Sequence, residues 1–125
     1  MAEAGLKLGM RLLTLEAPSN LDALLAGAPD LEHLPRAASF DCALAFAKTR
    51  SGVAAALARL EPKMPDGGMI WIAWPKKTSG VSTDLTEDLV RGVGLAAKLV
   101  DVKVCAIDAT WSGLKFVRRL RDRSA

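Results

Sequence analysis

Residues 69–74 read MIWIAW, an unbroken apolar run that follows the turn sequence PDGG and ends at Pro75. The apolar residues do not alternate with polar ones, so a strand here would have no face exposed to water. Strands of this kind occur in parallel sheets, because helices cover such sheets on both sides. The run therefore predicts a central parallel strand in an α/β domain.

Two further strand-like runs, each followed by a helix-like segment, precede this central run. Leu12–Leu15 is short and apolar, and the sequence LDALLAGA at 21–28 has helical spacing behind it. FDCALAFAK at 40–48 is almost entirely apolar, and SGVAAALARLEP at 51–62 repeats alanine and leucine at helical spacing before its proline. The proline-containing connection between the two units allows at most a short edge strand near Leu31–Leu34.

Downstream of the central run, the pattern indicates one helix and then a hairpin. Residues 83–99 begin with acidic side chains and end with a lysine, which is the charge order that suits a helix dipole. Thr83 or Asp84 would cap this helix. VDVKVCAI at 100–107 and LKFVRR at 114–119 flank the turn sequence ATWSG, so we expect them to pair as antiparallel strands.

Length and composition favour one folded domain. The chain has 125 residues, of which 50% are hydrophobic and 25% charged, and this suits a single core rather than a disordered segment. Strand and helix alternate three times before the hairpin, which predicts a single three-layer Rossmann-like α/β domain over residues 1–125 with a mainly parallel sheet. No apolar run is long enough to span a bilayer, and the first residues lack the pattern of an export signal. We therefore expect a cytoplasmic protein.

Residues 67–119, with the strings MIWIAWPKKTSGVSTDLTEDL and VDVKVCAIDATWSGLKFVRR, resemble a family of short bacterial proteins without an assigned activity. The order of elements is also similar to the class I methyltransferase fold, in which a terminal antiparallel strand inserts beside the last parallel one. That resemblance implies a five-strand sheet with the order 1-2-3-5-4 and an antiparallel C-terminal hairpin strand. A fold resemblance carries no function by itself.

A methyltransferase site needs a glycine-rich turn after the first strand and an acidic residue at the end of the next strand. The corresponding turn here reads EAPSNL at 16–21, and the second and third strands of the methyltransferase core are reduced to a linker. We therefore predict no cofactor; S-adenosylmethionine is either not bound or bound by a different route. The missing strands would also uncover one sheet edge, which predicts a homodimer through the first strand or the face of the first helix.

Ligands of parallel sheets gather at the carboxyl ends of the strands. In this chain that edge should collect Ser19 and Asn20, Lys48 and Thr49, Trp74 to Gly80, and Asp108 to Ser112. The segment WPKKTSGVSTD places two lysines before small hydroxyl residues and a helix start, a combination that suits an anion. The predicted ligand-binding residues are Lys76, Lys77, Thr78, Ser79, Gly80, Asp108 and Trp111.

Each of these residues also has a purely structural interpretation. Pro75 could end the strand, Gly80 could make a turn, and the lysines could be solvated. Asp108 could accept backbone N–H bonds in the hairpin turn while Trp111 packs on the neighbouring loop, instead of closing over a ligand as an exposed aromatic side chain. Trp71 and Trp74 should point to opposite faces of their strand.

No catalytic or metal-binding set is recognisable. Cys42 and Cys105 lie in apolar runs and should be free thiols, and His33 has no partner at a useful spacing. The arginines at 118–123 form a short basic tail, which more often is solvated than bound to nucleic acid. The sequence therefore favours a non-enzymatic binding or interaction module. The alternative is a small enzyme or ligand-dependent regulator that uses Lys76, Asp108 and Trp111 on a phosphate- or carboxylate-bearing small molecule.

Overall fold

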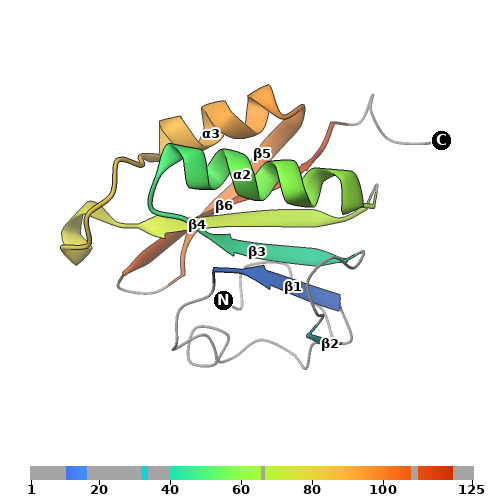
Figure 1. Cartoon of the computed structure of the whole chain (residues 1–125), viewed down its shortest axis with the longest axis horizontal. Helices are drawn as coiled ribbons and strands as arrows, with labels where there is room; N and C mark the ends of the chain where they lie inside the picture. Colours follow the sequence, from blue (N-terminus) through green and yellow to red (C-terminus); the bar gives the residue numbers. More distant parts are fainter. Residues whose placement is uncertain (1–10, 17–31, 34–39, 66, 108–109, 120–125) are drawn as a thin grey trace.

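The computed structural model describes residues 11–16, 32–33, 40–65, 67–107 and 110–119. Within them the chain forms a six-stranded sheet with the order β2-β1-β3-β4-β6-β5 (Figure 1). Its strands are β1 (Arg11–Leu15), β2 (Glu32–His33), β3 (Cys42–Phe46), β4 (Met69–Pro75), β5 (Leu99–Ala106) and β6 (Trp111–Arg118).

The topology is the one that the sequence predicts. β2, β1, β3 and β4 are parallel to one another, whereas β6 lies between β4 and β5 and is antiparallel to both. The order 1-2-3-5-4 of the five main strands is therefore confirmed. The two-residue β2 is the short edge strand expected near Leu31–Leu34, and it pairs with the start of β1 through Arg11 and Leu12.

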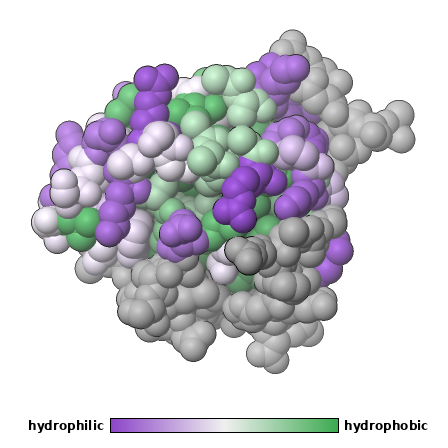
Figure 2. Space-filling model, viewed as in Figure 1, coloured by the Kyte–Doolittle hydropathy of each residue, from purple (hydrophilic) through white to green (hydrophobic). Residues whose placement is uncertain are grey.

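Two helices cover one face of this sheet, and on the outer surface of this face hydrophilic and hydrophobic residues are mixed (Figure 2). Helix α2 (Arg50–Leu60) begins after Thr49, whose hydroxyl accepts a hydrogen bond from the Gly52 amide at 3.1 Å, and it runs into the short 3-10 helix η2 (Glu61–Lys63). Helix α3 (Glu87–Ala96) lies beside α2 on the same side. The helix expected at 21–28, and with it the third layer, lies outside the described residues. No helix in the described segments is long and apolar enough to cross a bilayer.

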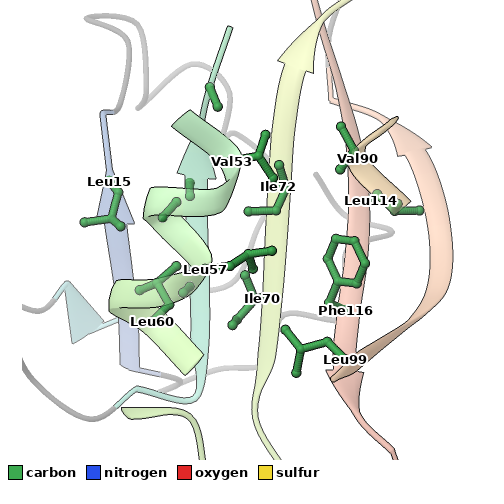
Figure 3. Close-up of a cluster of buried hydrophobic side chains, with 14 of the residues drawn as sticks. Leu15, Val53, Leu57, Leu60, Ile70, Ile72, Val90, Leu99, Leu114 and Phe116 are labelled. Atoms are coloured by element: carbon green, nitrogen blue, oxygen red, sulfur yellow. The ribbon is translucent and has the colours of Figure 1, made fainter. Parts of the chain in front are cut away.

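Strand β4 separates two layers of buried side chains. Ile70, Ile72 and Trp74 point toward α2 and α3, whereas Trp71 belongs to the cluster on the opposite face. Figure 3 shows side chains of both helices interdigitating with those of β4 and β6 in the first cluster. All seven residues of β4 are buried, which confirms the expectation from the unbroken apolar run, and the two tryptophans do lie on opposite faces.

The boundaries of α3 differ from the sequence prediction. The helix starts at Glu87 rather than at Thr83, and Thr86 is its N-cap. Thr83 and Asp84 do not cap α3, because their side chains are hydrogen-bonded to the turn between β3 and α2. At the other end Lys98 adopts a positive φ of 67°, which reverses the chain before β5, so the predicted extension of the helix to residue 99 is wrong.

Helix α3 is held closely against the hairpin. Gly94 faces the ring of Phe116 in β6, and a Cβ atom at this position would overlap that ring. On the solvent side, the guanidinium group of Arg91 donates to Asp101 of β5 at 2.8 Å and to Glu87 at 2.7 Å. These two contacts raise the pKa of Arg91, so the charge that links α3 to β5 persists at any ordinary pH.

The hairpin itself forms as expected but with a shorter turn. β6 begins at Trp111, three residues before the predicted start, because its first residues pair with the end of β4, with Trp111 opposite Pro75. Cys105 of β5 is partly exposed, while Cys42 of β3 is buried, and both are free thiols as predicted.

Candidate functional site

The carboxyl ends of β1, β3 and β4 meet at one edge of the sheet, as the parallel topology requires. Backbone hydrogen bonds continue past the strands and keep the edge together. The Ala47 amide donates to the Ala73 carbonyl at 2.9 Å, and the Lys76 amide donates to the Thr110 carbonyl at 2.7 Å. The chain segments that leave β3 and β4 are therefore held in a fixed arrangement.

A cavity of about 500 Å³ opens at this edge, beside the ends of β1 and β3 and the first turns of α2. This volume lies in the range of small-molecule sites in proteins. The described residues that line it are Leu15, Glu16, Phe46, Ala47, Lys48, Gly52, Ala55, Ala56, Arg59 and Trp111.

Apolar side chains form the rigid part of the cavity wall. The rings of Phe46 and Trp111 meet edge to face, with centroids 5.0 Å apart and planes at 84°. Both rings are largely buried, as is Leu15 at the end of β1. On the helix side, Gly52, Ala55 and Ala56 are small, so α2 leaves space between itself and the strand ends. The cavity therefore combines a fixed aromatic wall with a helix face on which Arg59 is the one long side chain among the described lining residues.

Glu16 supplies a carboxylate to this lining from a strained position. Its φ of 54° lies in the left-handed region, which a glutamate enters at a cost of about 1–2 kcal/mol. The residue directly follows β1, where the chain turns away from the sheet. The sequence thus keeps a charged side chain at a position where glycine would relieve strain.

Two cations, Lys48 and Arg59, also line the cavity. Lys48 follows β3, and its carbonyl accepts a hydrogen bond from the Thr83 hydroxyl at 2.7 Å. The same hydroxyl accepts from the Leu85 amide at 3.1 Å, so the loop before α3 fixes the backbone of Lys48. Arg59 comes from the last turn of α2.

The N-terminus of α2 is occupied by groups of the protein itself. Asp84 accepts a hydrogen bond from the Arg50 amide at 3.2 Å, and Thr49 accepts from the Gly52 amide. A helix N-terminus normally attracts anions through such amides. Here a carboxylate and a hydroxyl already accept from two of these amides. Among the described lining residues, the positive charge comes from the side chains of Lys48 and Arg59.

The segment Lys76–Gly80, which the sequence singled out, lies at the same edge but not around the cavity. It contains the 3-10 helix η3 (Lys77–Ser79), which projects beyond the tip of β4 in Figure 1. The Ser79 hydroxyl donates to the Lys76 carbonyl at 2.6 Å and accepts from the Val81 amide at 3.2 Å. Gly80 takes a left-handed φ of 79°. The small polar residues of this segment therefore close a local turn.

The other predicted site residues have different outcomes. Trp111 is 8% exposed rather than an exposed side chain over a ligand, because it starts β6 and packs on Phe46. It nevertheless lines the cavity. Asp108, like Ser19 and Asn20, lies outside the described residues. Lys48 lies at the carboxyl edge, where the sequence placed it.

Sequence reasoning did not identify Arg59, Glu16 or Ala55 as site residues. One signal was available, since Arg59 is the lone charged residue in the stretch SGVAAALARL, among alanines and leucines. No comparable signal marks Ala55, whose small side chain contributes to the cavity by leaving space open. Among the described residues, no group of three or more His, Cys, Asp or Glu side chains is placed to hold a metal ion.

Comparison with known proteins identifies the fold. No family model matches the chain, and none of the curated proteins matches it. Among solved structures it is similar to a ribosomal protein L11 methylase from Lactobacillus delbrueckii subsp. bulgaricus, with a TM-score of 0.64 and 10% identity over 94% of this chain and 74% of that one. It is also similar to an O-methyltransferase family 2 protein from Planctomyces limnophilus in complex with apigenin, with a TM-score of 0.62 and 13% identity. This second match covers 90% of the present chain but only 50% of the O-methyltransferase.

A third neighbour is the fibrillarin of Aeropyrum pernix with natively bound S-adenosyl-L-methionine, at a TM-score of 0.58 and 14% identity over 89% of this chain and 67% of that one. The domain has a methyltransferase-like fold. At identities this low, the likeness establishes the fold and leaves the activity open.

The described residues do not fit S-adenosylmethionine in the way that this fold implies. The residue that directly follows β1 is Glu16 rather than a glycine. The described part of β2 ends opposite Leu12, about 10 Å short of the end of β1. The charged lining described at the cavity is two cations and one carboxylate, whereas the cofactor is itself a net cation.

Proposed function

We propose that this domain is a non-enzymatic binding module that holds a small molecule in the cavity at the carboxyl ends of β1 and β3. The observation that carries the proposal is the cavity itself, with its aromatic wall and its few charged side chains. Ligand sites are typically concave and mostly apolar, with a small number of polar groups, and in α/β sheets they lie at this edge.

The chemistry of the lining supports binding rather than catalysis. Its charged side chains are Glu16, Lys48 and Arg59, and the described lining contains no serine, cysteine or histidine that could act as a nucleophile. Cys42 lies elsewhere, and burial raises the pKa of its thiol to about 12, so it stays protonated and unreactive at neutral pH.

The ligands of two structural neighbours support a small molecule as the partner. Fibrillarin of Aeropyrum pernix holds S-adenosyl-L-methionine, and the O-methyltransferase of Planctomyces limnophilus holds apigenin. Small molecules therefore bind to proteins of this architecture.

A pair of matched variants on α2 tests the proposal. Ala55 lines the cavity, whereas Ala58 faces the separate groove between α2 and α3, and both are exposed alanines of the same helix. Nucleotides, S-adenosyl compounds, phosphorylated metabolites and aromatic acids would be screened by thermal shift. A compound at 100 times its dissociation constant stabilises the protein by about 2.7 kcal/mol. We expect Ala55→Leu to remove the shift and Ala58→Leu to retain it.

The anion site predicted at Lys76–Gly80 remains the rival location. Its support is that Lys76 is tied to Thr110 at the same edge. If the small enzyme or regulator were the correct alternative, Lys76→Ala would abolish the thermal shift while Ala55→Leu would not. That result, or a screen in which no compound stabilises the protein, would contradict the binding module at the cavity.

The homodimer also stays a proposal. β2 pairs only with the first two residues of β1, so among the described strands nothing pairs with Leu13–Leu15 on that side. Unpaired strand edges favour association. Light scattering at micromolar concentration should give twice the monomer mass, and a monomer would refute the dimer. Cytoplasmic location and membership of the bacterial family that residues 67–119 resemble are likewise predictions.

A further inference from the structure

The cations that line the cavity have no carboxylate partner among the described residues, in contrast to three arginines elsewhere in the domain. Arg11, Arg91 and Arg118 form ion pairs at 2.7–3.3 Å with Asp41, Glu87 and Glu61. Within the described residues, neither Lys48 nor Arg59 has such a pair within 4.0 Å, and neither does Glu16. The described lining thus has an excess of positive charge, with two cations against one carboxylate, and no other described carboxylate forms an ion pair with these cations.

This charge stands beside a wall suited to a flat apolar body. Phe46 and Trp111 lie edge to face, and Leu15 extends the wall along the end of β1. Because water is displaced from such a wall when a ligand binds, a charge-assisted hydrogen bond next to it is stronger than one in open solvent. Apart from Arg59, the described lining residues of α2 are glycine and alanine, so that part of the helix limits the ligand by shape only through its backbone.

We propose that the cavity selects an aromatic anion, with Lys48 and Arg59 contacting the anionic group and Phe46, Trp111 and Leu15 holding the aromatic body. The inference rests on the proposed function and specifies its ligand class. It also separates this domain from its structural neighbours, because S-adenosylmethionine carries a sulfonium and an ammonium against one carboxylate and would place positive charge beside two cations.

Two fluorescent probes with the same aromatic body provide the test. Anilinonaphthalene sulfonate carries one sulfonate, and N-phenylnaphthylamine is the same molecule without it. Binding of each probe would be measured by fluorescence titration to the full chain, with S-adenosylmethionine as a competitor. We expect the sulfonate to bind about tenfold more tightly than the neutral probe, and S-adenosylmethionine not to displace it.

Charge variants then locate the preference. Lys48→Gln combined with Arg59→Gln replaces both cations with neutral, polar, unbranched side chains and should bring the two affinities together. Lys76→Gln combined with Lys77→Gln removes the same charge from η3 and should leave the preference intact. Raising the salt concentration should weaken binding of the sulfonate to the unaltered protein and leave the neutral probe unaffected.

The outcomes distinguish the two proposals. If Ala55→Leu weakens both probes but the sulfonate has no advantage, or if S-adenosylmethionine displaces it, the cavity binds small molecules and the anion preference is wrong. If Ala55→Leu changes neither probe relative to Ala58→Leu, the probes do not occupy the cavity and both proposals fail. A preference that survives the Lys48 and Arg59 changes but disappears with the Lys76 and Lys77 changes would move the anion site to η3.

Discussion

The carboxyl edge of this sheet has two halves that are built differently. The cavity half consists of the ends of β1 and β3, the first turns of α2 and Trp111, which come from distant parts of the chain. The lysine half consists of the consecutive residues Lys76–Gly80, whose hydrogen bonds close a turn within the segment. One half encloses volume between packed side chains, whereas the other presents charged side chains to solvent.

Both halves contain a residue in the left-handed region, and the residue types differ. In the lysine half this residue is Gly80, with a φ of 79°, where glycine has no steric cost. In the cavity half it is Glu16, with a φ of 54°, which stores strain. Strain of this kind persists only where the surrounding structure imposes it, so the comparison points to the cavity half as the more tightly constrained of the two.

The first prediction concerns packing, where the two halves should differ most. Phe46→Ala removes a side chain that is 4% exposed and leaves Trp111 without its ring partner. We expect the free energy of unfolding to fall by about 3–5 kcal/mol, measured by urea denaturation. Lys77→Ala in the lysine half is exposed and should change it by less than about 0.5 kcal/mol. Comparable losses in the two variants would show that the halves are equally packed.

A smaller effect is expected from the backbone of the lysine half. Gly80→Ala places a Cβ atom on a residue with a φ of 79°, so we expect a loss of about 1–2 kcal/mol in the free energy of unfolding. Gly67→Ala is the matched control, since Gly67 lies in a loop, has no positive φ and has open space at its Cβ position. If the two substitutions cost the same, the turn at Gly80 does not constrain the chain.

The smallest effect tests the link between the α3 loop and the cavity. Thr83→Val removes the hydrogen bond to the Lys48 carbonyl and the one from the Leu85 amide, which should lower the free energy of unfolding by about 1 kcal/mol. Because Lys48 then loses its backbone anchor, affinity for the sulfonate probe should also fall. Thr78→Val, at the exposed η3, should affect neither quantity. An unchanged affinity in Thr83→Val would mean that Lys48 needs no support from this loop.

The strands and their order were predictable because the signals are local. The unbroken run at 69–74 has no polar face, so it requires cover on both sides, and β4 is indeed buried throughout. The alternation of strand and helix then leaves few topologies. The start of α3 was misplaced for the opposite reason, since Thr83 and Asp84 have the composition of caps but bond to a turn that lies 34–35 residues earlier in the chain.

By itself, the sequence of this protein determined the type and succession of its elements, the parallel sheet with its antiparallel hairpin, and the edge at which Lys48 and Lys76 emerge. Only the tertiary structure decided which part of that edge is hollow. A cavity depends on the distances between residues such as Leu15, Ala55 and Trp111. It also depends on small side chains at positions where a larger side chain would fill the space. Packing of distant segments creates that volume, and no local pattern of residues encodes it.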